Sequence, residues 1–132
     1  MVKEFKDKNE WALILGGSSG LGLATAKKLA KHGLNICIVH RNSRSQLEKI
    51  ENEFKKITNE GVNFISYNTD AFQKEKRSEI IKDLSEKLVN GLIKILVHSV
   101  SKGNLKPMIS ETTPILQTDD FQLTIQAMGI SL

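Results

Sequence analysis

The chain has 132 residues, of which 39% are hydrophobic and 26% are charged, and its formal net charge is +4. This balance is that of an ordinary globular domain and excludes intrinsic disorder. No apolar run approaches the about 20 residues of a membrane-spanning helix, and the charged start of the chain lacks the apolar core of a signal peptide. We therefore expect a cytoplasmic protein with no membrane partner. Its lysines lie beside glutamates in helical segments, which is typical of solvated helix faces and argues against a nucleic-acid partner.

The single cysteine, Cys37, lies inside the apolar run NICIVH. One cysteine excludes an internal disulfide, and its apolar setting predicts a buried structural thiol. No group of His, Cys, Asp and Glu residues has the spacing of metal ligands, so we expect no metal site.

Strand-like and helix-like segments alternate along the chain. The predicted strands cover residues 11–15, 35–40, 62–67 and 92–97. The predicted helices carry on one face Leu21, Ala24, Leu29 and Ala30, then Leu47, Ile50, Phe54 and Ile57, and then Ile80, Ile81, Leu84 and Leu88. A long loop that contains Gly103, Pro107 and Pro114 is predicted to precede a last helix, which Thr118, Asp119 and Asp120 begin through capping and favourable dipole charge.

Four strands that alternate with helices predict parallel strands joined by right-handed crossovers. We therefore predict an α/β fold of the Rossmann type, a doubly wound parallel sheet with strand order 3-2-1-4 in three α/β/α layers. Residues 1–132 form a single domain in this interpretation. A ligand belongs at the carboxyl ends of the strands, around the point where the winding reverses.

The segment GGSSGLG, residues 16–22, joins the first predicted strand to the first predicted helix. Gly16 and Gly17 allow a sharp turn out of the strand, and Gly20 allows a bulky anionic group to approach the backbone. Gly22 lets the helix lie against the sheet. The start of the helix then offers unpaired N–H donors and a positive dipole end to a phosphate.

The setting of this loop favours a dinucleotide over a nucleoside triphosphate. A Walker A loop needs Lys and Ser or Thr directly after its last glycine, whereas Leu23 and Ala24 follow Gly22. A glycine cluster between the first strand and the first helix of a βαβ unit is instead typical of dinucleotide binding.

The residues after the second strand indicate which dinucleotide is bound. An acidic side chain there would bind the adenosine ribose of NAD and repel the extra phosphate of NADP. The sequence has HRNSR at 40–44, and the Arg41 guanidinium, with amide and hydroxyl donors beside it, suits a phosphate dianion. We therefore expect NADP(H), with His40 lining the adenosine site. In the alternative interpretation, Arg41 and Arg44 only cap the turn before the next helix.

The segment LGGSSGLG at 15–22 resembles the Thr-Gly-x-x-x-Gly-x-Gly motif of the short-chain dehydrogenases/reductases, with Leu15 where threonine is usual. The resemblance implies that Asp70 and Ala71 match the family's Asp-Val pair at the adenine, and that HSVS at 98–101 replaces its Asn-Asn-Ala-Gly. Together with the residues after the second strand, the cofactor-binding residues expected are Gly16, Ser18, Ser19, Gly20, Leu21, Gly22, His40, Arg41, Asn42, Asp70, Ala71, His98, Ser99 and Val100.

The sequence LVHS at 96–99 is similar to the form seen in enoyl-acyl-carrier-protein reductases, a branch of the same superfamily. The spacing of Phe121, Leu123, Ser131 and Leu132 also resembles that branch. The asparagine that ordinary members use for proton relay would fall near Gln126 or Ala127. This branch implies NADPH-dependent reduction of an enoyl thioester in fatty acid synthesis. Two alternatives are a ketone or 3-oxoacyl reductase of the same family and a non-catalytic dinucleotide-binding regulatory module.

Catalysis in this family uses a tyrosine and a lysine four residues apart. Tyr67 is the only tyrosine and Ala71 stands four residues later, so we expect no catalytic residue in this chain. His98 and Ser99 follow a strand at the ligand end, but no acidic residue stands nearby in the sequence to orient such a histidine. We expect the chain to be the cofactor-binding part of a longer, homo-oligomeric reductase of a small-molecule or acyl-thioester substrate. In this interpretation we expect the later strands, which would cover the edge of the fourth, to lie outside it.

Overall fold

The computed structural model describes residues 3–100, 115 and 117–126. Its elements are β1 (Glu10–Leu15), α1 (Gly20–Lys31), β2 (Asn35–His40), α2 (Arg44–Thr58), β3 (Phe64–Asn68), α3 (Lys74–Lys87), β4 (Leu92–His98) and α4 (Thr118–Ile125). The chain divides into two compact units, Met1–Ser99 and Val100–Leu132. Strand β3 begins two residues later than predicted, and the other strands begin and end within one residue of their predicted bounds.

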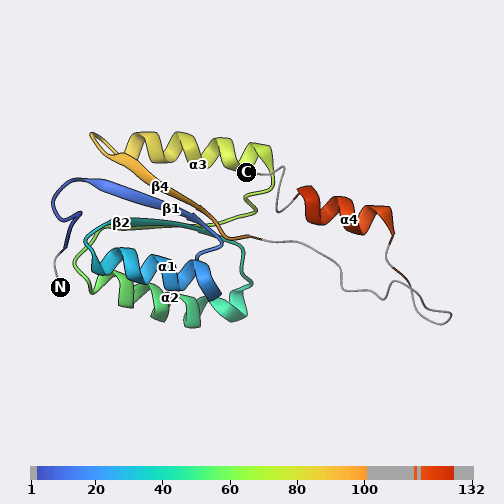
Figure 1. Cartoon of the computed structure of the whole chain (residues 1–132), viewed down its shortest axis with the longest axis horizontal. Coiled ribbons are helices and arrows are strands. Elements are labelled where there is room, and N and C mark those ends of the chain that lie inside the picture. The colour runs from blue at the N-terminus through green and yellow to red at the C-terminus, as the bar shows by residue number, and fades with distance from the viewer. Residues whose placement is uncertain (1–2, 101–114, 116, 127–132) are drawn as a thin grey trace. The chain divides into compact units, whose positions relative to one another are not determined.

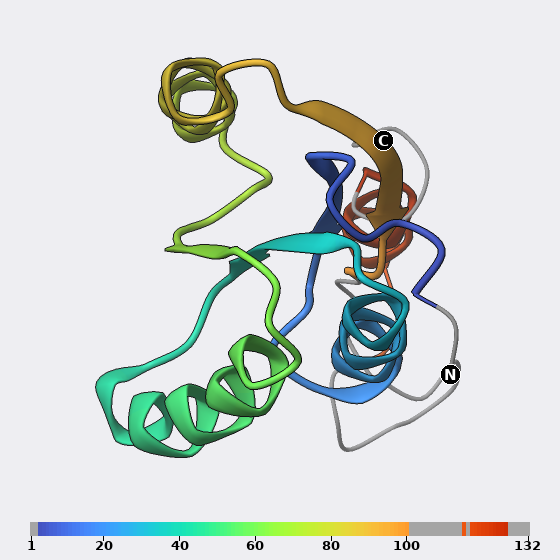
Figure 2. The same cartoon turned by 90° about the vertical axis from the view of Figure 1, so that its left-hand side faces the viewer.

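All four strands of the first unit are parallel and lie in the order β3-β2-β1-β4. Helices α1 and α2 cover one face of this sheet and α3 covers the other, as Figures 1 and 2 show from two directions. The predicted order and the three-layer arrangement are therefore confirmed. A parallel sheet has two apolar faces that it cannot bury by itself, so the helical crossovers supply the second and third layers.

Helix α1 packs on the sheet through a stripe of small residues. Gly22, Ala26 and Ala30 are its buried positions, spaced four residues apart. The predicted stripe was wrong at two places, because Leu21 and Ala24 are exposed. Small side chains at every fourth residue let the helix axis come close to β1 and β2. The core below them includes Ala12, Ile14, Ile36, Ile38 and, from α2, Ile50, Phe54 and Ile57.

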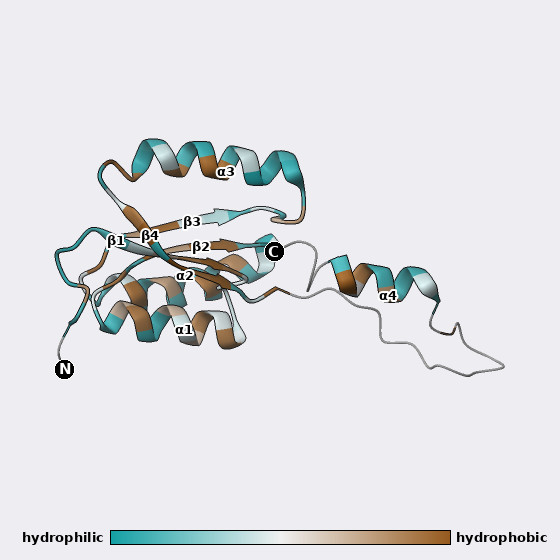
Figure 3. Ribbon diagram, turned by 45° about the horizontal axis from the view of Figure 1, so that its top comes forward, coloured by the Kyte–Doolittle hydropathy of each residue, from teal (hydrophilic) through white to brown (hydrophobic). Residues whose placement is uncertain are grey.

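The other face of the sheet is covered by α3. Ile80 and Leu84 are buried there with Trp11, Cys37 and Val39, whereas Ile81, predicted to share this face, is exposed. Figure 3 shows hydrophobic residues along β2 and mainly hydrophilic residues on α3. Burial raises the pKa of the Cys37 thiol to about 12. The prediction of a buried structural thiol is therefore confirmed.

Strand β4 pairs only with β1 in the described sheet. Its apolar residues Leu92 and Leu96 are exposed, while Lys94 forms an ion pair with Glu10 of β1. Among the described residues, no helix is both long enough and apolar enough to cross a membrane.

In the second unit, α4 begins at Thr118 as predicted, but its N-cap residue is Gln117. The backbone N–H of Gln117 donates to Asp120 Oδ2 at 2.9 Å. The acidic first turn thus satisfies the start of this helix. Gly103, Pro107, Pro114, Ala127, Ser131 and Leu132 lie outside the described residues.

Candidate dinucleotide site

The carboxyl ends of the four strands bring the predicted site segments to one edge of the sheet. Three backbone hydrogen bonds continue the strand pairing past the strand ends: Gly16 N to Val39 O (2.8 Å), Thr69 N to His40 O (2.8 Å) and Ser99 N to Leu15 O (2.9 Å). The loops that begin at Gly16, Arg41, Asp70 and Ser99 therefore lie side by side. This edge is where an open parallel sheet binds its ligand.

The glycines of the first loop are each required for a different reason. Gly16 has φ +83°, which glycine adopts without strain. A Cβ on Gly17 would lie 2.8 Å from Ile38 Cγ2, so this glycine allows close packing on β2 and is not needed for the turn itself. A Cβ on Gly22 would lie 2.2 Å from the carbonyl oxygen of Gly16, so α1 can start here only if this residue is glycine.

The start of α1 has the features of an anion site. Gly20 has φ +56°, and nothing lies within 4 Å of the place where its Cβ would be. The N-cap residue Ser19 is extended and its side chain forms no capping hydrogen bond, and the first turn carries no acidic residue. Leu21 is 82% exposed. The first turn of α1 thus carries no carboxylate of its own, and the space beside Gly20 is open, so this helix start fits a phosphate group.

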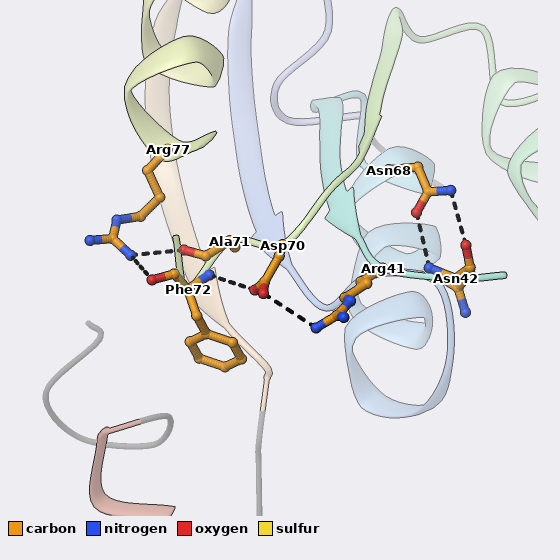
Figure 4. Close-up of polar contacts among 7 residues, drawn as sticks. All are labelled: Arg41, Asn42, Asn68, Asp70, Ala71, Phe72 and Arg77. Carbon is orange, nitrogen blue, oxygen red and sulfur yellow. Dashed lines mark hydrogen bonds and ion pairs between the residues drawn. The ribbon is translucent and has the colours of Figure 1, made fainter. Parts of the chain in front are cut away.

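Arg41 and Asp70 project from the ends of β2 and β3 and meet. Arg41 Nη1 lies 3.2 Å from Asp70 Oδ2, and the other carboxylate oxygen, Oδ1, accepts a hydrogen bond from Phe72 N at 3.0 Å (Figure 4). The Arg41 side chain is 68% exposed, and that of Asp70 is 16% exposed. The turn after β3 thus fixes the carboxylate, while most of the guanidinium remains open to an anion.

Neither Arg41 nor Arg44 is the N-cap residue of α2. Ser43 is the N-cap residue of this helix, and its N–H donates to Gln46 Oε1 at 3.2 Å. Arg44 is the first helical residue and is exposed.

Asn42 connects the glycine loop to β2 and α2. Its Oδ1 accepts a hydrogen bond from Ser18 Oγ at 2.8 Å and lies 2.9 Å from His40 Nδ1. An amide oxygen only accepts, so the arrangement requires the His40 tautomer that carries its proton on Nδ1. Asn42 Nδ2 donates to Gln46 Oε1 at 3.2 Å.

The His40 imidazole is directed into the core and does not line the open edge as expected. It is 6% exposed and packs edge to face on Phe54 at 5.4 Å between ring centroids. Burial lowers the pKa of His40, and the hydrogen bond with Asn42 opposes that effect. Alternation along β2 explains the placement, because Ile36, Ile38 and His40 all face the α1 and α2 layer.

Asn68, which sequence reasoning missed, holds the backbone after β2. Its Oδ1 accepts from Asn42 N at 2.9 Å and its Nδ2 donates to Asn42 O at 3.1 Å (Figure 4). The residues are 26 positions apart. The only hint in the sequence is that Asn68 is a polar residue at the end of a strand. Such residues are too common to identify a contact of this kind.

A cavity of about 390 Å³ lies beside the glycine loop, between the beginnings of α1 and α2. Its lining residues are Ser18, Ser19, Gly20, Leu23, Lys27, Asn42, Gln46, Lys49, Ile50 and Glu53. Two of the lining residues, Lys27 and Glu53, form an ion pair. A larger cavity of about 600 Å³ is lined by residues such as Lys6, Gly33 and Gly61, before the strands begin. The 390 Å³ cavity thus adjoins four predicted site residues, Ser18, Ser19, Gly20 and Asn42.

The remaining predicted site residues lie at the ends of β3 and β4. The carbonyl oxygens of Ala71 and Phe72 both accept hydrogen bonds from Arg77 Nη1 at 2.9 Å, which ties this turn to α3 (Figure 4). His98 is the last residue of β4 and pairs with Leu15. Val100 is the first residue of the second unit.

Tyr67 has a structural setting and not that of a catalytic acid. Its hydroxyl donates to Asp83 Oδ2, and Lys87 lies 5.5 Å from its ring centroid. Burial, with the Asp83 hydrogen bond, raises the pKa of Tyr67 well above its usual range. Within the described part of the chain, no three His, Cys, Asp or Glu residues come together as metal ligands.

Comparison with known proteins agrees with this geometry. The family described as short chain dehydrogenase matches residues 10–128. A very-long-chain 3-oxoacyl-CoA reductase of Coccidioides immitis is 32% identical over 97% of this chain and 35% of its own length. The crystal structure of NAD+-bound xylitol dehydrogenase is 26% identical, with a TM-score of 0.74, over 98% of this chain and 45% of that one. A blue fluorescent protein from a metagenomic library, solved with NADPH, is 20% identical with a TM-score of 0.74 over 97% and 48%. The chain thus spans about a third of the curated relative and under half of either solved chain.

Proposed function

The chain belongs to the short-chain dehydrogenase/reductase family, and from that premise we propose that it is the NADP(H)-binding domain of a reductase of 3-oxoacyl thioesters. Family membership makes it part of a short-chain oxidoreductase. The observation that carries the cofactor preference is the exposed Arg41 guanidinium at the end of β2, where an NAD-binding domain would place an acidic side chain. The solved relatives hold either NAD+ or NADPH, so the preference rests on this chain's own residues.

The site residues have separable tasks in this proposal. The backbone N–H groups at Gly20 and Leu21, at the positive end of α1, bind the pyrophosphate. Arg41 binds the 2′-phosphate, with Asn42 beside it in the same loop, and Asp70 accepts a hydrogen bond from the adenine. When bound, the nicotinamide supplies the hydride for reduction. His98 and Ser99 lie beside the end of β1, where Ser99 N donates a hydrogen bond to Leu15 O.

The curated relative supports a 3-oxoacyl substrate over the enoyl substrate that LVHS suggests. The Coccidioides immitis protein is named a 3-oxoacyl-CoA reductase, and its likeness covers 97% of the chain. The two substrates are distinguished by supplying a 3-oxoacyl-CoA or a trans-2-enoyl-CoA with NADPH to a protein that contains this chain and a Tyr-x-x-x-Lys segment. We expect NADPH oxidation with the 3-oxoacyl thioester. Oxidation with the enoyl thioester alone would support the first interpretation instead.

The cofactor preference is tested by equilibrium binding. Arg41→Asp replaces the guanidinium by a carboxylate, so NADPH binding should weaken by about 1.5 to 3 kcal/mol while NADH binding changes little. Equal weakening of both cofactors would contradict the assignment of Arg41 to the 2′-phosphate. Arg44→Asp is the matched control, because Arg44 is exposed on the first turn of α2. It should change the ratio of the two affinities less than Arg41→Asp does.

The 132-residue chain by itself should bind NADPH without turnover. Tyr67 is its only tyrosine, and the Asp83 hydrogen bond keeps that hydroxyl protonated. The sequence has no lysine four residues after that tyrosine, so it lacks the pair that the family uses as proton donor. Measurable NADPH oxidation by the short chain with a 3-oxoacyl-CoA would overturn this part of the proposal.

A further inference from the structure

The backbone on both sides of Arg41 is fixed by β3. On one side, His40 O accepts the backbone hydrogen bond of Thr69 N at 2.8 Å. On the other side, the Asn68 side chain binds both the N–H and the carbonyl oxygen of Asn42. We propose that Asn68 is a positioning residue for 2′-phosphate recognition, which it serves by holding the Asn42 backbone so that Arg41 projects over the open edge of the site. This inference rests on the proposed NADP(H) preference.

The Asn68 side chain forms the hydrogen bonds that the backbone of a further β3 residue would form with β2. The register of β2 and β3 ends at the pair His40 and Asn68, and one further main-chain hydrogen bond, from Thr69 N to His40 O, follows it. Beyond that pair, the amide group of Asn68 presents an acceptor at 2.9 Å and a donor at 3.1 Å to the single residue Asn42. The main chain of a neighbouring strand would offer the same pair of groups, one acceptor and one donor. The Asn68 amide therefore extends the hydrogen bonding along β2 by two residues, to Asn42. Arg41 lies between the two residues whose backbones are held in this way, His40 and Asn42.

The side-chain contact of Arg41 is too weak to orient it alone. Its ion pair with Asp70 spans 3.2 Å, but the Arg41 side chain is 68% exposed. Exposed ion pairs of this kind contribute at most about 1 kcal/mol, because solvent screens them and a long side chain loses rotational freedom. When the backbone is already fixed, the side chain has less conformational entropy to lose on binding an anion. Preorganisation of this kind increases the affinity.

The strand pair offers a matched control at its other end. Asn35, the first residue of β2, accepts a hydrogen bond from Asn63 N through its Oδ1 at 2.9 Å. Asn35 and Asn68 are therefore both asparagines that bind the backbone of the neighbouring segment. Asn35 lies at the amino end of the sheet, away from the glycine loop. Its loss should affect stability without affecting phosphate recognition.

The experiment compares 2′,5′-ADP with 5′-AMP, which differ by the 2′-phosphate alone, in calorimetric titrations of the full 132-residue chain. Asn68→Ala should reduce the preference for 2′,5′-ADP about tenfold, because a guanidinium displaced by about 1 Å loses charge-assisted hydrogen bonds to the phosphate. The affinity for 5′-AMP should stay within about twofold, and Asn35→Ala should leave the preference unchanged. If Asn68→Ala does not fold by circular dichroism, Asn68→Thr carries the same test with a side chain suited to a strand end.

A double variant distinguishes this inference from the cofactor assignment. If Asn68 acts through Arg41, then Asn68→Ala should have no further effect on the preference in an Arg41→Ala background. A preference lost in Arg41→Ala but kept in Asn68→Ala would overturn the positioning role and leave the NADP(H) proposal intact. A preference unchanged in Arg41→Ala would overturn both. Additive losses in the double variant would show that Asn68 acts independently of Arg41 and would also overturn the inference.

Discussion

Arg41 Nη1 and Asp70 Oδ2 lie 3.2 Å apart, although the two residues are separated by 29 positions in the sequence (Figure 4). The parallel pairing of β2 with β3 brings them together, since each is one of the first residues after its strand. The group proposed for the 2′-phosphate thus already has an anionic partner. An incoming phosphate must share the guanidinium with that carboxylate.

Asp70→Asn should therefore strengthen binding of the 2′-phosphate. The substitution removes a negative charge next to Arg41, and the amide oxygen can still accept the hydrogen bond from Phe72 N. Because the pair is exposed on the arginine side, the gain for 2′,5′-ADP over 5′-AMP should be about two- to fivefold. Titration calorimetry with both ligands measures it.

Glu79→Gln is the matched control for that charge change. It removes one carboxylate from the exposed Lys76 ion pair on α3 and should leave the ligand preference unchanged. Weaker binding of 2′,5′-ADP to Asp70→Asn would show that the carboxylate orients Arg41 more than it competes with the phosphate.

Gly22→Ala should destabilise the protein and impair dinucleotide binding together. The new Cβ would lie 2.2 Å from the carbonyl oxygen of Gly16, so α1 must shift away from the loop. We expect a loss of about 1 to 3 kcal/mol in urea denaturation. Gly61→Ala, at φ +84° in open space away from the site, is the control and should cost about 1 to 2 kcal/mol without affecting NADPH binding. Full NADPH affinity in Gly22→Ala would contradict this geometry.

The stability of the chain should fall as the pH drops below about 6.5 because of His40. Burial lowers the pKa of His40 in the folded protein, so below its ordinary pKa the unfolded chain binds the proton more strongly. The contribution of His40 to the free energy of unfolding is complete above about pH 6.5 and is lost as the pH falls through the pKa of the folded protein. The free energy of unfolding then changes by at most about 1.4 kcal/mol per pH unit. Urea denaturation between pH 7.5 and about 5 measures this slope.

His40→Leu should flatten the pH dependence in that range, and equal slopes for the two proteins would exclude His40 as its cause. The carboxylates of Glu53 and Asp83 act at lower pH. Hydrogen bonds from Lys27 and Lys87 hold their pKa values below the ordinary ones, so their contribution is lost only as the solution becomes more acidic.

Tyr67→Phe should cost stability without affecting nucleotide binding. It removes the hydrogen bond to Asp83, which keeps its ion pair with Lys87 at 2.8 Å. The expected loss is about 1 kcal/mol in the free energy of unfolding. Unchanged NADPH affinity, measured beside the stability, supports a structural role. A selective loss of affinity would place Tyr67 in the binding site.

The alternation of strands and helices, the strand order and the position of the glycine loop were predictable because they depend on local signals. Apolar periodicity and glycine spacing can be recognised within short stretches of consecutive residues. The right-handedness of crossovers then leaves few possible topologies. Helix faces were less predictable. Ile81 and Leu21 are apolar but exposed, because the face that meets the sheet is set by packing.

The sequence by itself determined the family, the parallel α/β sheet and the edge at which the site lies. Only the tertiary structure decided how that site is assembled. It directed His40 into the core, paired Arg41 with Asp70, and joined Asn68 to the backbone of Asn42. These contacts link residues on different strands, so they depend on the register and on the alternation of side chains between the two faces of the sheet. No local pattern in the chain encodes that register, because it is set when the whole core packs.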